Sequence, residues 1–164
     1  MPSSLTLITH SPEETQRLGR LLGEQAQPGD LFLFSGPLGV GKTTLIQGIA
    51  FGLGVKEYAR SPTFVLVTQY RGRLALYHMD LFRVDNPLEV LDLGLDEYLE
   101  SGGVCVIEWA ERAEELFPWE CLWVHMEYGK GQTERRIRLE ARGDRYQGLV
   151  ASLERPLAAY RKEG

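Results

Sequence analysis

The sequence predicts an α/β fold with a mixed parallel and antiparallel sheet flanked by helices. A short, wholly apolar run at residues 31–34 precedes a glycine-rich turn and a helical pattern, which is typical of a strand buried in a parallel sheet. Two pairs of alternating segments around glycine-containing turns predict antiparallel hairpins. The length of 164 residues fits one compact domain, so we expect a single domain over residues 1–164.

Composition narrows the class of protein. The chain is 43% hydrophobic and 25% charged, close to the average for globular proteins. A net charge of −5 argues against a free-standing nucleic-acid binder, since such domains are usually basic. No apolar run is long enough to cross a membrane, so we expect a cytoplasmic protein. Two cysteines, Cys105 and Cys121, provide neither a disulfide framework nor a zinc site.

The first third of the chain has clear element boundaries. Residues 4–9 alternate as a strand does. Ser11, Pro12 and Glu14 form a helix start with a capping box, and residues 28–29 (Pro-Gly) end that helix. The apolar run that follows predicts a strand, and the helical pattern after the glycine-rich turn extends to about residue 53.

The remaining elements follow in order. Alternating runs at residues 63–70 and 73–79 predict a hairpin, and residues 86–87 open a helix that Gly94 closes. We further expect a strand at residues 104–107, a second hairpin from strands at 121–128 and 135–140, and a final helix over about 144–157.

A phosphate-binding motif lies between the apolar strand and the next helix. Residues 36–43 (GPLGVGKT) fit the pattern G-x-x-x-x-G-K-[ST] in full. Glycines let backbone N–H groups approach phosphate oxygens, and the helix N-terminus adds partial positive charge. Lys42 is suited to neutralise the β- and γ-phosphates, and the Thr43 hydroxyl to bind Mg²⁺. The sequence therefore predicts a P-loop NTPase-like domain.

The nucleotide base is predicted from an absent motif. Guanine-selective P-loop proteins usually carry N-K-x-D, but the only asparagine of the chain, Asn86, is followed by Pro87. ATP is therefore the expected nucleotide.

Two acidic residues follow predicted strands. Glu108 ends the more continuous apolar run, which we expect beside the P-loop strand, and we assign it to the metal. Asp80 ends the other run. It has three possible roles: a second contact to metal-bound water, a sensor of the γ-phosphate, or a turn or capping residue before residues 81–82.

Other residues near these motifs allow two readings. His78 fits a packed core residue better than a catalytic one, and Trp109 fits a buried aromatic better than a site wall. Thr63, after Pro62, either turns its hydroxyl toward the γ-phosphate or simply begins a strand. A basic cluster fits a solvated strand face better than a contact with nucleotide, RNA or an acidic partner; its members are Arg135, Arg136, Arg138, Arg142 and Arg145.

Four motifs taken together resemble a known family. They are residues 36–44 (GPLGVGKTT), 61–64 (SPTF), 77–83 (YHMDLFR) and 106–109 (VIEW). In this order, and at this length, they resemble the bacterial TsaE (YjeE) family. These are small P-loop ATPases needed to make threonylcarbamoyladenosine in tRNA, beside the anticodon. The resemblance covers most of the chain and extends to Thr9, Ser11 and Thr15.

The resemblance implies an accessory role. Members are weak Mg²⁺-dependent ATPases that act with the threonylcarbamoyltransferase subunits of the TsaD and TsaB families, and they do not transfer the group themselves. ATP and Mg²⁺ are the implied cofactors, and contact with tRNA is expected to be indirect. No arginine finger is identified in the sequence, which fits a slow ATPase whose geometry a partner completes.

The resemblance also implies roles for individual residues. Lys42 would hold phosphate, Thr43 and Glu108 would hold Mg²⁺, and Asp80 would be a switch residue required for hydrolysis. The segment from Thr9 to Ser11, together with Thr133, would contact the adenosine end. The implied nucleotide-binding set is Thr9, Ser11, Gly36, Pro37, Leu38, Gly39, Val40, Gly41, Lys42, Thr43, Thr44 and Thr133.

Two other functions stay open. A small-molecule P-loop kinase would share the size and the loop, and Arg135 with Arg136 would then be read as a lid, although both fall in a hairpin pattern. A binding module would use ATP only as an assembly signal. We expect instead that ATP binding orders residues 61–63 and the Asp80 segment into a partner-binding surface, and that hydrolysis releases the partner.

Overall fold

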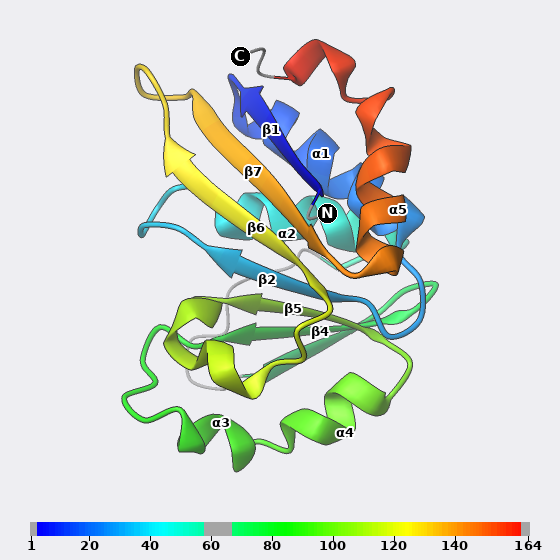
Figure 1. Ribbon diagram of the computed structural model, residues 1–164, viewed down its shortest axis with the longest axis vertical. Coiled ribbons are helices and arrows are strands. Elements are labelled where there is room, and N and C mark those ends of the chain that lie inside the picture. The colour runs from blue at the N-terminus through cyan, green and yellow to red at the C-terminus, as the bar shows by residue number, and fades with distance from the viewer. Residues whose placement is uncertain (1–2, 58–66, 162–164) are drawn as a thin grey trace.

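A computed structural model describes residues 3–57 and 67–161 (Figure 1). Its centre is a seven-stranded mixed sheet in the order β1-β7-β6-β2-β5-β4-β3. The predicted α/β class is therefore confirmed. The strands are β1 (Ser3–Thr9), β2 (Leu31–Ser35), β3 (Val67–Arg71), β4 (Ala75–Asp80), β5 (Val104–Glu108), β6 (Cys121–Tyr128) and β7 (Arg135–Arg142).

The central strand β2 lies between β5 and β6 and runs parallel to both. Strand β4 is parallel to β5, so β2, β4 and β5 end at the same edge of the sheet (Figure 1). The expectation that residues 104–107 form a strand beside the P-loop strand is confirmed. Both predicted hairpins are present as antiparallel pairs, β3 with β4 and β6 with β7, although residues 63–66 of the first predicted strand lie outside the described residues.

Helices cover both faces of the sheet (Figure 1). Helices α1 (Pro12–Gln25), α2 (Lys42–Gly52) and α5 (Asp144–Glu154) pack on one face and enclose the larger apolar core. The short helices α3 (Leu88–Leu91) and α4 (Leu95–Glu100) and the 3₁₀ helix Ala110–Leu116 enclose a second core on the other face. A 3₁₀ turn at Ala158–Tyr160 follows α5.

Some boundaries differ from the sequence-based expectation. One helix closed by Gly94 was predicted, whereas Gly94 adopts a left-handed conformation (φ 79°) and separates α3 from α4 as the N-cap of α4. Ser11 does cap α1, and Pro12 is its first residue. The Glu14 carboxylate, however, accepts its hydrogen bond from the N–H of His10, one residue before the cap.

Helices α1 and α2 are in backbone contact through glycines. A Cβ at Gly19 would overlap the carbonyl oxygen of Leu45, and a Cβ at Gly48 would overlap that of Gln16. Gly23 and Gly52 make equivalent close approaches. Helix α2 begins at the phosphate loop and α1 begins at Pro12. The close contact between the helices therefore fixes the distance between their first turns, which line the same cavity.

Both cysteines are free and buried. Within residues 3–57 and 67–161, no helix combines the length and apolar character needed to span a bilayer.

Candidate functional site

The phosphate loop connects β2 to α2 at the edge where the parallel strands end. Gly36, Gly39 and Gly41 have φ values of 148°, 78° and 112°, which side-chain-bearing residues rarely adopt. A Cβ at Gly36 would also lie 2.5 Å from the carbonyl oxygen of Met126. Glycine is therefore required here both for the turn and for packing against β6.

The side chain of Lys42 is 4% exposed and has two contacts. Its Nζ donates a 2.6 Å hydrogen bond to the carbonyl of Gly36 and lies 3.5 Å from the centroid of the Trp109 ring. Burial lowers the pKa of Lys42, while the nearby carboxylates, foremost Glu108, oppose that shift. The ammonium group is thus held at the loop by groups that a phosphate can replace.

Both expectations for Trp109 are met in part, because it packs against the second apolar core and also contacts the phosphate-loop lysine. It is half-buried, contacts Lys42, and its ring centroid lies 5.0 Å from that of Phe82. Its φ of 58° is the one positive value of a non-glycine residue in the described part of the chain. Such conformations cost free energy and cluster at functional sites.

Thr43 and Glu108 meet at the loop. The Thr43 hydroxyl donates a 3.3 Å hydrogen bond to Oε1 of Glu108, which is 3% exposed. A hydroxyl and a carboxylate are hard oxygen ligands of the kind Mg²⁺ takes, and in nucleotide sites phosphates and water complete its shell. The donor set present here therefore fits a magnesium ion.

His78 contacts the same carboxylate. It is 0% exposed, and its Nε2 lies 2.7 Å from Oε2 of Glu108. A carboxylate oxygen accepts, so we assign the proton to Nε2. Sequence reasoning expected a packed core residue; burial is confirmed, but the contact with Glu108 was missed because it joins two strands distant in sequence.

Asp80 lies directly across from Glu108 in the pairing of β4 with β5. Its Oδ1 accepts a 2.9 Å hydrogen bond from the N–H of Phe82, so the predicted turn role is present. Burial raises the pKa of Asp80, the Phe82 N–H opposes this, and the charge of Glu108 adds to it. A switch role is compatible with this position, since the carboxyl group is half-buried beside the P-loop. Thr63 lies outside the described residues.

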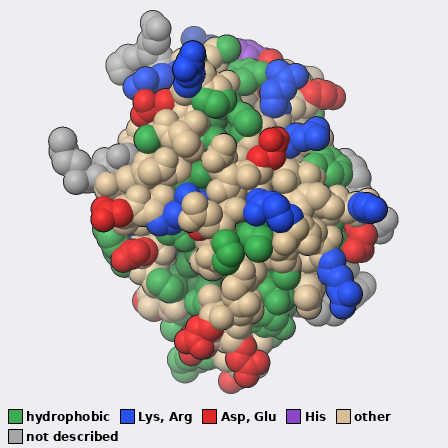
Figure 2. All heavy atoms as spheres, turned by 90° about the vertical axis from the view of Figure 1, so that its right-hand side faces the viewer, with side chains coloured by type: hydrophobic (Ala, Val, Ile, Leu, Met, Phe, Trp, Pro, Cys, Tyr) green, Lys and Arg blue, Asp and Glu red, His purple; other side chains and the backbone are tan. Residues whose placement is uncertain are grey.

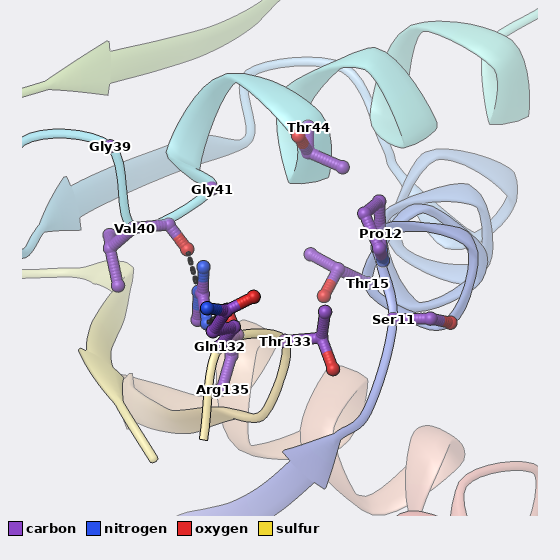
Figure 3. A pocket seen from close by; sticks show the side chains of 10 residues that line it. All are labelled: Ser11, Pro12, Thr15, Gly39, Val40, Gly41, Thr44, Gln132, Thr133 and Arg135. Atoms are coloured by element: carbon purple, nitrogen blue, oxygen red, sulfur yellow. Dashed lines mark hydrogen bonds between the residues drawn. The ribbon is translucent and has the colours of Figure 1, made fainter. Parts of the chain in front are cut away.

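A cavity of about 190 Å³ opens beside the phosphate loop (Figure 3). The start of α1 and the β6–β7 turn form two of its walls, with the loop and the first turn of α2 above them in the view. Its lining consists of Ser11, Pro12, Thr15, Gly39, Val40, Gly41, Thr44, Gln132, Thr133 and Arg135.

The structure brings most of the predicted nucleotide residues to this loop and cavity. Ser11, Thr44 and Thr133 line the cavity, although they come from three distant segments. Thr9 does not line the cavity, because its side chain is 1% exposed. Its hydroxyl lies 2.7 Å from the hydroxyl of Thr15, and Thr15 is a lining residue. At the loop tip, Leu38 is 69% exposed, and Pro37 beside it is exposed too.

The predicted basic cluster is divided among three places. Arg135 lies on the same face of β7 as Ile137 and Leu139, which belong to the larger core, and it lines the cavity. Arg145 forms an ion pair with the buried Asp30, with Nη2 and Oδ2 2.7 Å apart. The residues of opposite parity on β7 lie on its other face and pair with glutamates; they are Arg136, Arg138 and Arg142.

The prediction of a solvated strand face thus applies only to those three. On the side of the molecule drawn in Figure 2, basic and acidic side chains of the described residues are also interspersed, with no large region of one charge. Arg135 was missed as a cavity residue. The signal was present in the sequence, because Arg135 shares its parity with the apolar positions Ile137 and Leu139.

Comparisons with known proteins identify relatives over most of the chain. The family model described as "Threonylcarbamoyl adenosine biosynthesis protein TsaE" matches residues 9–137. A tRNA threonylcarbamoyladenosine biosynthesis protein TsaE from Bacillus subtilis is 44% identical over 148 residues, covering 90% of this chain and 92% of the relative. One of the same description from Treponema pallidum is 40% identical, covering 68% and 82%.

A solved structure agrees with these sequence relatives. The crystal structure of YdiB from Bacillus subtilis superimposes with a TM-score of 0.82 at 39% identity, covering 95% of this chain and 97% of that one. The four motifs found in the sequence, the family match and this shared fold lead to one conclusion: the chain belongs to the TsaE family of threonylcarbamoyladenosine biosynthesis proteins.

Proposed function

We propose that this chain binds ATP with Mg²⁺ and hydrolyses it slowly, as an accessory factor in the threonylcarbamoyladenosine modification of tRNA. The observation that carries the proposal is the 3.3 Å hydrogen bond between the Thr43 hydroxyl and Glu108, at the mouth of a complete phosphate loop. It joins the two oxygen ligands that a P-loop NTPase uses for its metal. The names of the relatives support the tRNA pathway.

Each residue has a role in this mechanism. When bound, Mg²⁺ would supply positive charge that offsets the negative charge of the phosphates. Thr43 and Glu108 hold the ion, and Lys42 exchanges its contact with the Gly36 carbonyl for phosphate oxygens. Asp80 is the switch residue, and it pairs directly with Glu108 on the neighbouring strand. The cavity beside the loop takes the adenosine end, against Ser11 and Thr133.

A slow rate without partners follows from the arginines near the loop. An arginine finger raises kcat by a factor of about 10³–10⁵ in GTPases that use one. Arg135 already donates to the Val40 carbonyl, and Arg112 stacks 5.6 Å from the ring centroids of Phe82 and Trp109. We therefore propose that the threonylcarbamoyltransferase subunits of the TsaD and TsaB families complete the site, with tRNA contacted indirectly.

The test is phosphate release from ATP by the chain alone, then with those subunits and tRNA. We expect negligible release alone and a clear rise with the partners. Rapid release alone, near the 10 s⁻¹ typical of enzymes, or phosphoryl transfer to an added acceptor, would favour a self-sufficient catalyst or a kinase. No release in either mixture would leave ATP as an assembly signal. The same conclusion would follow if Asp80→Ala or Glu108→Ala supported tRNA modification without hydrolysis.

A binding variant checks the location of the site. Lys42→Ala should weaken ATP binding sharply while unfolding stays cooperative, because the substitution removes the one cation of the loop. Lys56→Ala is the matched control, since Lys56 is an exposed lysine beyond the end of α2. Equal ATP affinity of Lys42→Ala and Lys56→Ala would refute this location.

A further inference from the structure

Two side chains of the β6–β7 hairpin hold carbonyl groups of the phosphate loop. The Tyr128 hydroxyl donates a 2.7 Å hydrogen bond to the carbonyl of Leu38. Nε of Arg135 donates a 2.8 Å hydrogen bond to the carbonyl of Val40, the dashed line in Figure 3. A carbonyl held in this way cannot turn its oxygen toward an incoming phosphate, so the loop N–H groups remain available to the anion.

Arg135 is itself fixed in place. It pairs directly with Tyr128 across the hairpin, and its guanidinium carbon lies 4.8 Å from the centroid of the Tyr128 ring. Nη1 donates to the carbonyls of Gln132 and Glu134, at 2.8 and 2.9 Å. A planar guanidinium backed by an aromatic ring and bonded at two nitrogens has little freedom left to lose when a ligand arrives.

The same guanidinium borders the cavity. Arg135 lines it together with Ser11 and Thr133, on the side of the β6–β7 turn (Figure 3). The arginine therefore contacts both halves of the site, the loop at Val40 and the space beside it. A flat cation of this kind attracts the π-face of a ring such as a nucleobase.

We propose that Arg135 is a positioning and specificity residue that couples these two halves. It holds the Val40 carbonyl away from the phosphates, and it forms the wall against which the nucleoside of a nucleoside triphosphate packs. This inference rests on the proposed nucleotide binding and adds a residue to it. It predicts two separable losses when the guanidinium is removed, one in phosphate binding and one in nucleoside binding.

The experiment compares ATP with inorganic tripolyphosphate, which has the phosphates and no nucleoside. Both compete in Mg²⁺ buffer against a fluorescent ADP analogue on the full chain. The variants are Arg135→Ala and Arg135→Lys, where lysine keeps the charge and loses the planar fork. The matched control is Arg136→Ala, because Arg136 is the next residue, carries the same charge, and lies on the opposite face of β7. Thermal unfolding checks that each variant is folded.

We expect Arg135→Ala to weaken tripolyphosphate binding about tenfold, the effect of one lost charged hydrogen bond, and ATP binding by about tenfold more. Arg135→Lys should lose most of the affinity for both ligands. If Arg135→Ala does not fold, the result for Arg135→Lys decides the question. Arg136→Ala should change either affinity less than about twofold.

Three results would overturn the inference. Affinities of the Arg135 variants equal to those of Arg136→Ala would remove the role altogether. Equal losses of affinity for ATP and tripolyphosphate would show that Arg135 does not contact the nucleoside. A loss of affinity for ATP alone would show that its hydrogen bond to the Val40 carbonyl does not support phosphate binding. Failure of the wild-type chain to bind ATP is a different result, and it would refute the proposed function itself.

Discussion

Nε2 of the fully buried His78 donates a 2.7 Å hydrogen bond to Oε2 of Glu108, whose other oxygen accepts the Thr43 hydroxyl. The imidazole thereby fixes the orientation of the carboxylate that we assign to the metal. Side chains that orient a metal ligand typically contribute 10–100-fold to affinity or activity.

His78→Leu should therefore raise the Mg²⁺ concentration that half-maximally strengthens ATP binding by about 10–100-fold. His78→Gln should recover part of this loss, because its amide nitrogen can reach the place of Nε2. ATP titrations at several Mg²⁺ concentrations measure the effect, with affinity in EDTA as the control that should not change. If ATP binding by His78→Leu depends on Mg²⁺ as it does in the wild-type chain, then the hydrogen bond from His78 does not orient Glu108.

Gly48→Ala should lower the free energy of unfolding by about 2 kcal/mol or more. A Cβ there would overlap the backbone oxygen of Gln16 on α1, so the two helices must separate. Gly148→Ala is the control: Gly148 lies in α5, where a Cβ would meet nothing within 4 Å, and alanine should stabilise that helix by about 0.5–1 kcal/mol. Urea unfolding measures both. Equal stabilities of the two variants would contradict the close helix contact.

Neither cysteine should react with a thiol reagent in the native protein. Burial raises the pKa of both Cys105 and Cys121 to about 12, and their exposed fractions are 1% and 0%. At pH 8 roughly one thiol in 10⁴ would then be ionised, and the thiolate is the nucleophile. After Ellman's reagent is added, absorbance should show no release of thionitrobenzoate from the native protein. After denaturant is added, it should show release of two equivalents per chain, one for each cysteine. Rapid labelling of either residue under native conditions would contradict the burial described here.

Local patterns predicted much of the fold and the centre of the site. The phosphate loop was visible because its glycines, Lys42 and Thr43 are adjacent in the chain. Glu108 was visible because an apolar run precedes it. The contact of His78 with Glu108 was not, since it depends on the register of β4 against β5, 30 residues apart.

The same limit explains Arg135 and the helices after β4. The parity of Arg135 with Ile137 and Leu139 indicates which face of β7 it occupies, but its hydrogen bond to Val40 spans 95 residues and no local pattern indicates that contact. Gly94 was recognised as a helix boundary, but glycine in a left-handed conformation can close one helix or begin the next. Only packing of Val90 and Leu95 into the second core decides between these outcomes.

Asp80→Asn should raise the free energy of unfolding at pH 7, without nucleotide or Mg²⁺, and abolish ATP hydrolysis. Burial raises the pKa of Asp80 above the usual 3.8. Its contribution to stability is then full below pH 3.8 and is lost as the pH rises through the folded-state pKa, so the charge is unfavourable at pH 7. Asparagine removes that charge and keeps the acceptor for the Phe82 N–H. The increase in the free energy of unfolding, measured with urea, should become smaller as the pH is lowered. An increase that becomes larger at low pH, or no increase at pH 7, would contradict the raised pKa of Asp80.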